Sequence, residues 1–379
     1  MRLRDLGVTV GTMPTGPWNT ITDVAGVRVG HSTIVEGDGP LVVGQGPVRT
    51  GVTIIEPRAR LARDEPAFAG TFTLNGNGEM TGLEWIREAG ILTTPIGLTN
   101  THSVGVVRDA LVEAELEERT DDAVYWSMPV VAETFDGALS DINGLHVKPR
   151  HVREALAGAA SGAVPEGGVG SGTGMVCYEF KGGIGTSSRA VPGEYGGFTV
   201  GALVQANHGI RERMCVDGYP VGRFLPKERI PSTWDELAAV RGKSGLPGTG
   251  SIIIVLATDA PLLPHQCTRL AKRAVNGIAR TGGGNEDPSG DIFIAFATGN
   301  TGIPRAEYLV GHGIDYPVRS VTGEVLTQLF LAAVEAVEEA IVNAVVAADT
   351  VVGCDGVTAH GLDPELLLEA MRAAGWRGS

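Results

Sequence analysis

The feature that most constrains the fold is the run Ile252-Ile253-Ile254-Val255-Leu256, in which every residue is apolar. A strand that faces water on one side alternates apolar and polar residues, whereas an unbroken β-branched run predicts a strand covered on both faces. The run Ile292-Phe293-Ile294-Ala295-Phe296 has the same character. Two strands of this kind require further layers of structure above and below them.

Helical patterns separate and follow the predicted strands. Apolar residues recur at steps of three and four from Leu326 to Val345, which predicts one long helix. Further helices are expected over residues 265–280, around 81–89 and from 363 to about 376. The mixture predicts a layered α/β protein in which helices cover sheets, with additional strands at shorter β-branched runs, namely residues 27–29, 52–55 and 198–200.

The composition excludes several classes of protein. With 43% hydrophobic and 20% charged residues among 379, the chain can bury a sizeable core and is not intrinsically disordered. Its 30 basic and 44 acidic side chains give a formal charge of −14, which argues against nucleic acid as a partner. No apolar run reaches the roughly 18 residues of a membrane span, and the first residues lack the apolar stretch of a signal peptide. We therefore expect a cytoplasmic protein without nucleic-acid or membrane partners.

No metal and no other cofactor is expected. The histidines do not pair at ligand spacing, and the glycine-rich run of residues 167–174 lacks the leading strand and the following Lys-Ser/Thr of a phosphate-binding loop. The run is better explained by close backbone packing around a site. The four cysteines are too far apart for a zinc or redox motif: Cys177, Cys215, Cys267 and Cys354.

A polar segment runs directly into the most apolar strand. Residues 226–250, rich in proline and glycine, predict a flexible linker that ends at Gly250, and Ser251 opens the strand. A surface loop that enters a core strand would look the same. A hydroxyl at this place would also suit an N-terminal nucleophile, because a cut before Ser251 frees an α-amine of pKa about 7.7–8.0 that can act as its base.

Seven sequence blocks in one order resemble the serine N-terminal-nucleophile aminopeptidases of the DmpA type. This family comprises L-aminopeptidase/D-amidase-esterases and β-peptidyl aminopeptidases, and it shares its fold with ornithine acetyltransferase. The blocks cover nearly the whole chain and lie at residues 17–33, 75–82, 129–137, 170–175, 204–207, 248–253 and 289–291.

The resemblance implies one catalytic domain over residues 1–379 with a four-layer αββα sandwich of the DmpA/ArgJ type. The chain would cleave itself between Gly250 and Ser251 into an α chain, 1–250, and a β chain, 251–379, which stay together. Ser251 would be the nucleophile and, through its new amine, the base. Relatives form tetramers, so a homo-oligomer of αβ units is expected.

Three further residues match the family's catalytic positions. Ser289 and Asp291 would support the nucleophile, with Asp291 orienting Ser289 and stabilising the ammonium of Ser251. Asn207 would donate its amide to the oxyanion of the tetrahedral intermediate. Without the resemblance, Asp287-Pro288-Ser289-Gly290 would be interpreted as a turn, and Asn207 as a turn residue before Gly209.

Two residues match the family's substrate pocket. Glu133 is the candidate partner of a free substrate amine, since an aminopeptidase must bind an ammonium group. Phe135 stands where some relatives have a tyrosine, so it would shape the pocket wall without adding a second oxyanion donor. A solvated glutamate at a helix end or in a loop is the alternative for Glu133, and Glu79 is expected to cap the helix that follows it.

The sequence therefore predicts a self-processing aminopeptidase that hydrolyses amide bonds, and also esters, beside a free amino group of a small peptide or amino-acid amide. Two alternatives remain at this point: an acyltransferase of the ornithine acetyltransferase type, and a catalytically silent scaffold. The acyltransferases use a threonine nucleophile, whereas this chain has Ser251.

Overall fold

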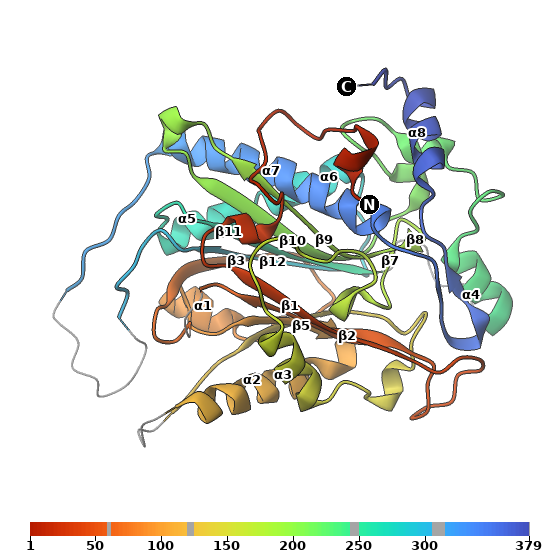
Figure 1. Cartoon of the computed structure of the whole chain (residues 1–379), viewed down its shortest axis with the longest axis horizontal. Helices are drawn as coiled ribbons and strands as arrows, with labels where there is room; N and C mark the ends of the chain where they lie inside the picture. Colours follow the sequence, from red (N-terminus) through yellow and green to blue (C-terminus); the bar gives the residue numbers. More distant parts are fainter. Residues whose placement is uncertain (59–61, 120–124, 243–249, 305–314, 379) are drawn as a thin grey trace.

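Two β-sheets stacked face to face form the centre of the molecule, and helices cover the outer face of each sheet (Figure 1). The computed structural model describes residues 1–58, 62–119, 125–242, 250–304 and 315–378. Within these ranges the small sheet has the strand order β1 (Arg28–Glu36), β2 (Val48–Glu56), β5 (Ile96–Asn100), β6 (Val130–Thr134). The large sheet has the order β4 (Ile91–Leu92), β3 (Ala67–Gly76), β12 (Gly290–Ala297), β11 (Ser251–Thr258), β10 (Thr199–Asn207), β9 (Gly183–Ala190).

The helices divide between the two outer faces. On the small sheet lie α2 (Val104–Glu118) and α3 (Pro149–Ala157). On the large sheet lie α5 (Pro264–Ala271) and α7 (Gly323–Val346), with α6 (Ala274–Thr281) packed beside α7. This is the expected four-layer αββα sandwich. The remaining elements lie at its edges: α1 (Leu83–Ala89), α4 (Thr233–Arg241), α8 (Pro364–Ala373) and the short ladders β7 (Val176–Cys177) with β8 (Phe180–Lys181) and β13 (Val351–Val352) with β14 (Thr358–Ala359).

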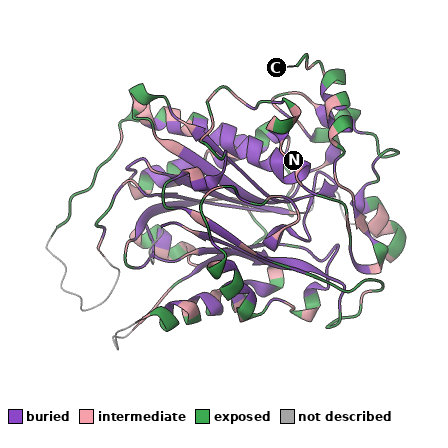
Figure 2. Ribbon diagram, viewed as in Figure 1, coloured by how far each residue is buried: buried purple, intermediate pink, exposed green. Residues whose placement is uncertain are grey.

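Strand β11 is buried along its whole length, as its apolar run predicts (Figure 2). Alternate residues point to opposite faces of a strand. Ile252, Ile254 and Leu256 join the cluster beneath the helices of the large sheet. Ile253 and Val255 join the cluster between the two sheets. A third cluster fills the space between the small sheet and its helices, so the four layers enclose three apolar interfaces.

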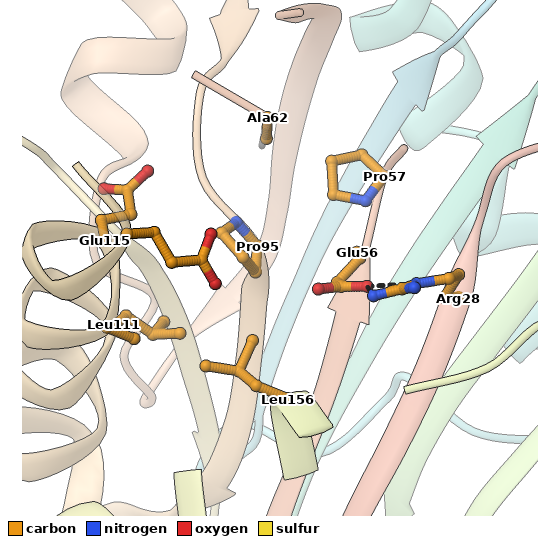
Figure 3. A pocket seen from close by; sticks show the side chains of 10 residues that line it. Arg28, Glu56, Pro57, Ala62, Pro95, Leu111, Glu115 and Leu156 are labelled. Atoms are coloured by element: carbon orange, nitrogen blue, oxygen red, sulfur yellow. Dashed lines mark hydrogen bonds and ion pairs between the residues drawn. The ribbon is translucent and has the colours of Figure 1, made fainter. Parts of the chain in front are cut away.

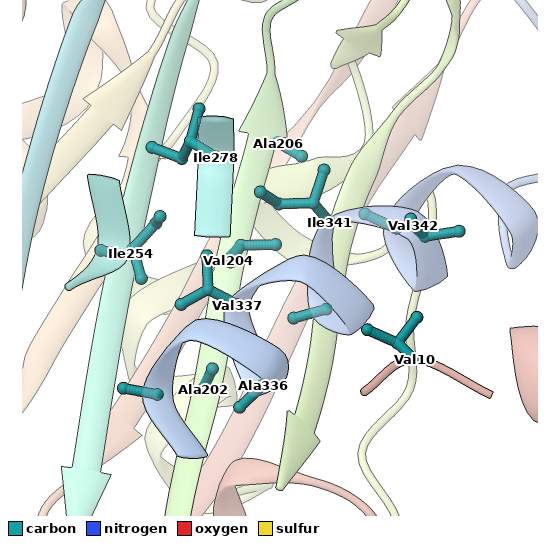
Figure 4. Packing of buried hydrophobic residues seen from close by; sticks show 14 of the residues in the cluster. Val10, Ala202, Val204, Ala206, Ile254, Ile278, Ala336, Val337, Ile341 and Val342 are labelled. Atoms are coloured by element: carbon teal, nitrogen blue, oxygen red, sulfur yellow. The ribbon is translucent and has the colours of Figure 1, made fainter. Parts of the chain in front are cut away.

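Small residues let α7 approach the large sheet closely (Figure 4). A Cβ on Gly185 of β9 would lie 1.9 Å from the carbonyl oxygen of Ala340, so only glycine fits at this crossing. Ala202 on the neighbouring strand β10 lies under the same helix. For this one of the chain's 55 glycines, close packing against a helix is the reason for the residue type.

The predicted strands and most of the predicted helices are present, with two differences. The helix expected over residues 265–280 is broken at Lys272 and Arg273, because α5 covers β3 and β12 whereas α6 packs against α7. The segment 226–250, predicted to be a flexible linker, contains α4, so that part of the prediction is wrong for residues 233–241. Residues 243–249 lie outside the described residues.

Across the part of the chain that the structure describes, no helix has both the length and the apolar character that crossing a lipid bilayer requires.

Removing side-chain volume from β11 should destabilise the fold. Ile254→Ala should lower the free energy of unfolding by about 2–5 kcal/mol, because it leaves a cavity in a fully buried cluster. Val35→Ala on β1, where the side chain is 60% exposed, should change it by less than about 0.5 kcal/mol. Urea titration of both variants measures the difference, and equal losses would contradict the two-sided burial of β11.

Candidate active site

Three strand ends of the large sheet meet at Ser251. Ser251 is the first residue of β11, and it pairs with Asn207, the last residue of the antiparallel strand β10. On its other side it pairs with Gly290, the first residue of the parallel strand β12. Residues far apart in the sequence therefore lie side by side because the strands begin and end at one edge.

Ser251 and the carbonyl group before it share one backbone donor. The Gly290 N–H donates to Ser251 Oγ at 3.1 Å and to the Gly250 carbonyl oxygen at 3.3 Å. The serine side chain is nearly enclosed, since only 6% of the residue is exposed. A Cβ on Gly250 would lie 1.9 Å from the carbonyl oxygen of Asn207, so a larger residue does not fit before the serine.

Ser289 and Asp291 lie together, as predicted. Ser289 Oγ donates to Asp291 Oδ1 at 2.6 Å, and both residues are buried. The second carboxylate oxygen accepts a hydrogen bond from Asn75 Nδ2 at 2.7 Å. Burial raises the pKa of Asp291, and the hydrogen bonds from Ser289 and Asn75 oppose that rise. In this arrangement the Ser289 hydroxyl points to Asp291, whereas the hydrogen bond of Ser251 Oγ comes from Gly290.

Backbone groups fix the side-chain amide of Asn207 at both ends. Its Nδ2 donates to the Phe135 carbonyl oxygen at 2.9 Å, and its Oδ1 accepts from the Val176 N–H at 2.7 Å. The second of these bonds assigns the oxygen and the nitrogen of the amide. Because an amide nitrogen carries two hydrogens, one N–H remains for a further acceptor.

A cavity of about 470 Å³ opens in front of Ser251, between the ends of the two sheets. The large sheet contributes the nucleophile candidate, and the small sheet contributes Glu133 and, just past β6, Phe135. The aromatic ring is 49% exposed and forms part of the wall. Ser289, Asp291 and Asn207 lie behind the lining, which consists of Asn77, Gly78, Glu79, Thr101, Glu133, Phe135, Gly250, Ser251 and Pro288.

Glu133 is a buried carboxylate held by two donors. Its Oε1 accepts from the Glu79 N–H at 3.0 Å, and its Oε2 accepts from the Thr101 hydroxyl. Burial raises the pKa of Glu133 above its ordinary range, and these two hydrogen bonds oppose the rise. The residue is therefore a strand residue at the cavity wall and not a solvated glutamate of a helix end or loop.

Several groups of the site were not predicted from the sequence. Thr101 and the backbone N–H of Gly290 have no motif signal, and Asn75 lies in one of the family blocks without an expected role. The expectation that Glu79 caps a helix is wrong, because α1 begins after Gly82 without a side-chain cap. Glu79 instead lines the cavity and binds Glu133 through its backbone.

A second pocket of about 140 Å³ lies between the small sheet and its helices (Figure 3). Arg28 and Glu56 form an ion pair on one side of it, and burial raises the pKa of Glu115 on α2 to about 7. The described residues that line it include no serine, threonine or cysteine, so they offer no nucleophile. Among the described residues, no group of three or more His, Cys, Asp or Glu side chains is placed to hold a metal ion.

The αββα sandwich, with a serine at the start of a buried strand, is the architecture of the N-terminal-nucleophile hydrolase fold. The chain belongs to peptidase family S58, whose family model matches residues 19–359. It is therefore a peptide hydrolase.

Three relatives illustrate the similarity. A β-aminopeptidase from a Burkholderia species is 56% identical, has a TM-score of 0.91, and each chain covers all of the other. The L-aminopeptidase D-Ala-esterase/amidase of Ochrobactrum anthropi, which has a variant of the Ntn-hydrolase fold, is 44% identical with a TM-score of 0.87 over 99% of both chains. The β-peptidyl aminopeptidase BapA of Sphingosinicella microcystinivorans is 49% identical over 362 residues, which are 95% of this chain and 89% of the relative. These relatives do not favour the acyltransferase alternative.

Removing the Thr101 hydroxyl should raise the pKa of Glu133 further. Thr101→Val deletes a donor to the carboxylate at nearly constant shape, so less opposes the effect of burial and the pKa of Glu133 should rise. Thr327→Val on the exposed face of α7 is the control and should leave it unchanged. Carbon-13 NMR titration of the glutamate carboxyls measures the shift, with Glu133→Gln identifying the signal. An unchanged pKa in Thr101→Val would contradict the hydrogen bond.

Proposed function

We propose that this peptide hydrolase cuts its own chain between Gly250 and Ser251 and then removes N-terminal residues from small peptides through an ester on Ser251. The observation that carries the proposal is the cavity on which Ser251 and the buried carboxylate of Glu133 converge. The Ser251 hydroxyl can form an ester with the substrate, and the Glu133 carboxylate can bind the ammonium group of the substrate.

The first reaction is an acyl shift within the chain. Ser251 Oγ attacks the carbonyl carbon of Gly250, a C–O bond forms, and the negative charge develops on the Gly250 oxygen. The Gly290 N–H already donates to that oxygen, which supports it as an oxyanion donor. The C–N bond then breaks, the Ser251 nitrogen takes up the hydroxyl proton, and water hydrolyses the ester to a Gly250 carboxylate and a free Ser251.

The free amine of Ser251 can then act as the base for later reactions. A buried amine prefers the neutral form, whereas the carboxylate of Asp291 favours the ammonium form. Ser289 donates to Asp291, which supports its role as the hydroxyl that links this carboxylate to the Ser251 amine. The free N–H of Asn207 and the N–H of Gly290 would together bind the substrate oxyanion, so the missing hydroxyl at Phe135 is not needed.

Glu133 would select substrates with a free amino group, because a buried carboxylate attracts an ammonium more strongly than one in water. The β-aminopeptidase names of two relatives support peptides with an N-terminal β-amino acid as substrates of this chain. The hydrolysis of esters expected from the sequence has the same support from the Ochrobactrum relative, an esterase/amidase. Assembly of αβ units into a homo-oligomer and a cytoplasmic location stay predictions.

Self-cleavage predicts two bands, near two-thirds and one-third of 39.4 kDa, on a denaturing gel. The small band should begin Ser-Ile-Ile-Ile-Val. Ser251→Ala should remain one folded chain without activity, because the attacking oxygen is gone, whereas Ser251→Cys should still cut.

Ser32→Ala is a matched control for this experiment. Ser32 is 6% exposed, like Ser251, and it lies within a strand, β1, where its hydroxyl donates to Glu154. This variant should be cut like the unmodified protein. A single intact band with full activity would rule out the proposed mechanism.

Glu133→Gln should raise KM for a free-amine substrate about ten- to hundred-fold and change kcat little, since the charge pair forms in both the ground and the transition state.

For the unmodified protein, KM should rise as the pH falls through the pKa of Glu133, which burial places above the ordinary range. Glu133→Gln should lack that dependence. Glu79→Gln removes the exposed carboxylate of the same cavity, and water screens it, so its effect should be small. Equal turnover of an N-acetylated and a free-amine substrate would show that no ammonium is recognised.

A further inference from the structure

The carboxylate of Asp291 is fully buried and is solvated by neutral donors alone. Ser289 Oγ donates to Oδ1 at 2.6 Å, and Asn75 Nδ2 donates to Oδ2 at 2.7 Å. In the described part of the chain no lysine or arginine forms an ion pair with it. A buried carboxylate without an ion-pair partner among the described residues depends on its hydrogen bonds to stay ionised.

An irregularity in the sheet places Asn75 opposite Asp291. Strand β3 pairs with β12 regularly up to Thr73 opposite Ile292, but the next pair is Asn75 with Asp291. Leu74 is therefore an extra residue, a β-bulge. In a regular ladder Leu74 would oppose Asp291 and place an apolar side chain beside the carboxylate. The bulge replaces it with an amide donor, since directly opposed residues share a face of the sheet.

We propose that Asn75 is a positioning residue that holds Asp291 ionised and turned toward Ser289, and that it thereby sets the pH range in which the chain cleaves itself. This inference rests on the self-cleavage proposed above. Asn75 does not touch the scissile bond and acts only through Asp291.

The groups around Asp291 determine in which direction the pH range of self-cleavage moves when the Asn75 amide is removed. Burial and the carboxylate of Glu286 raise its pKa, whereas Ser289, Asn75 and the backbone N–H of Ile252 lower it. Removing the Asn75 amide therefore raises the pKa of Asp291. The proposed support of Ser251 by Ser289 requires the ionised carboxylate of Asp291, which orients that hydroxyl. At a given acidic pH fewer molecules carry the carboxylate, so the acid limb of the cleavage rate moves to higher pH.

Measurements on the uncut precursor separate the effect of the Asp291 pKa from the titration of the Ser251 amine. Before cleavage the Ser251 nitrogen is a peptide amide and does not titrate. The acid limb of the self-cleavage rate therefore has no contribution from the Ser251 amine, whereas the acid limb of peptide hydrolysis would contain it. The carboxylate of Glu133 lies in the same cavity, so the shift of the limb in the Asn75 variants identifies the contribution of Asp291.

The experiment uses full-length precursor made by cell-free translation and transferred rapidly to buffers between about pH 4 and 9. The fraction cut over time is measured on denaturing gels for the unmodified chain, Asn75→Ala and Asn75→Asp. Asn75→Ala should move the acid limb up by about one to two pH units, the equivalent of one lost hydrogen bond to a charge. Asn75→Asp keeps the shape, loses the donor and adds a like charge, so its limb should move further.

Asn19→Ala is the matched control, because Asn19 is also buried and its Nδ2 donates to a carboxylate, that of Glu339, at 2.6 Å. The acid limb of self-cleavage in Asn19→Ala should coincide with that of the unmodified chain, even where the cleavage rate of the variant is lower. An unmoved limb in both Asn75 variants, with the unmodified chain cutting normally, would overturn the inference and leave Asn75 a structural residue. An unmodified chain that stays intact at every pH would instead refute self-cleavage, and the inference with it.

Discussion

The parallel pairing of β11 with β12 is the constraint on which the rest of the site depends. It places Ser251 beside Gly290, so that a single N–H reaches both the serine oxygen and the carbonyl in front of it. Both strands are buried on both faces, which leaves them little freedom to slide. A shift by one residue would turn every apolar side chain of β11 to the wrong layer. The position of Ser251 is therefore fixed by the core.

The two sheets contribute different parts of the chemistry. The large sheet carries Ser251, Asn207 and the Ser289–Asp291 pair at strand ends. The small sheet carries Glu133, which its neighbours Thr101 and Glu79 hold at the cavity wall. The proposed reaction centre and the proposed recognition group thus belong to separate layers joined by the apolar cluster between them. Substitutions in the small sheet can change the binding of substrate while the strand ends around Ser251 stay in place.

Much of the fold could be predicted from the sequence, because burial leaves a direct mark on composition. The apolar run of β11 predicted a two-sided strand, and the spacing from Leu326 predicted α7. The break between α5 and α6 could not be predicted, since it depends on which neighbour each helix covers. In the site, the family blocks located Ser251, Glu133 and Asp291. The bulge at Leu74 and the N–H of Gly290 are properties of register and backbone, and no residue type marks them.

Strand β11 is held by its neighbours on both sides from its first residue onward. The bonds that keep Ser251 in place run across the sheet and not along the chain. The covalent link from Gly250 to Ser251 therefore adds little to the placement of the strand. The two neighbouring strands would keep β11 in register even with the backbone open at this point.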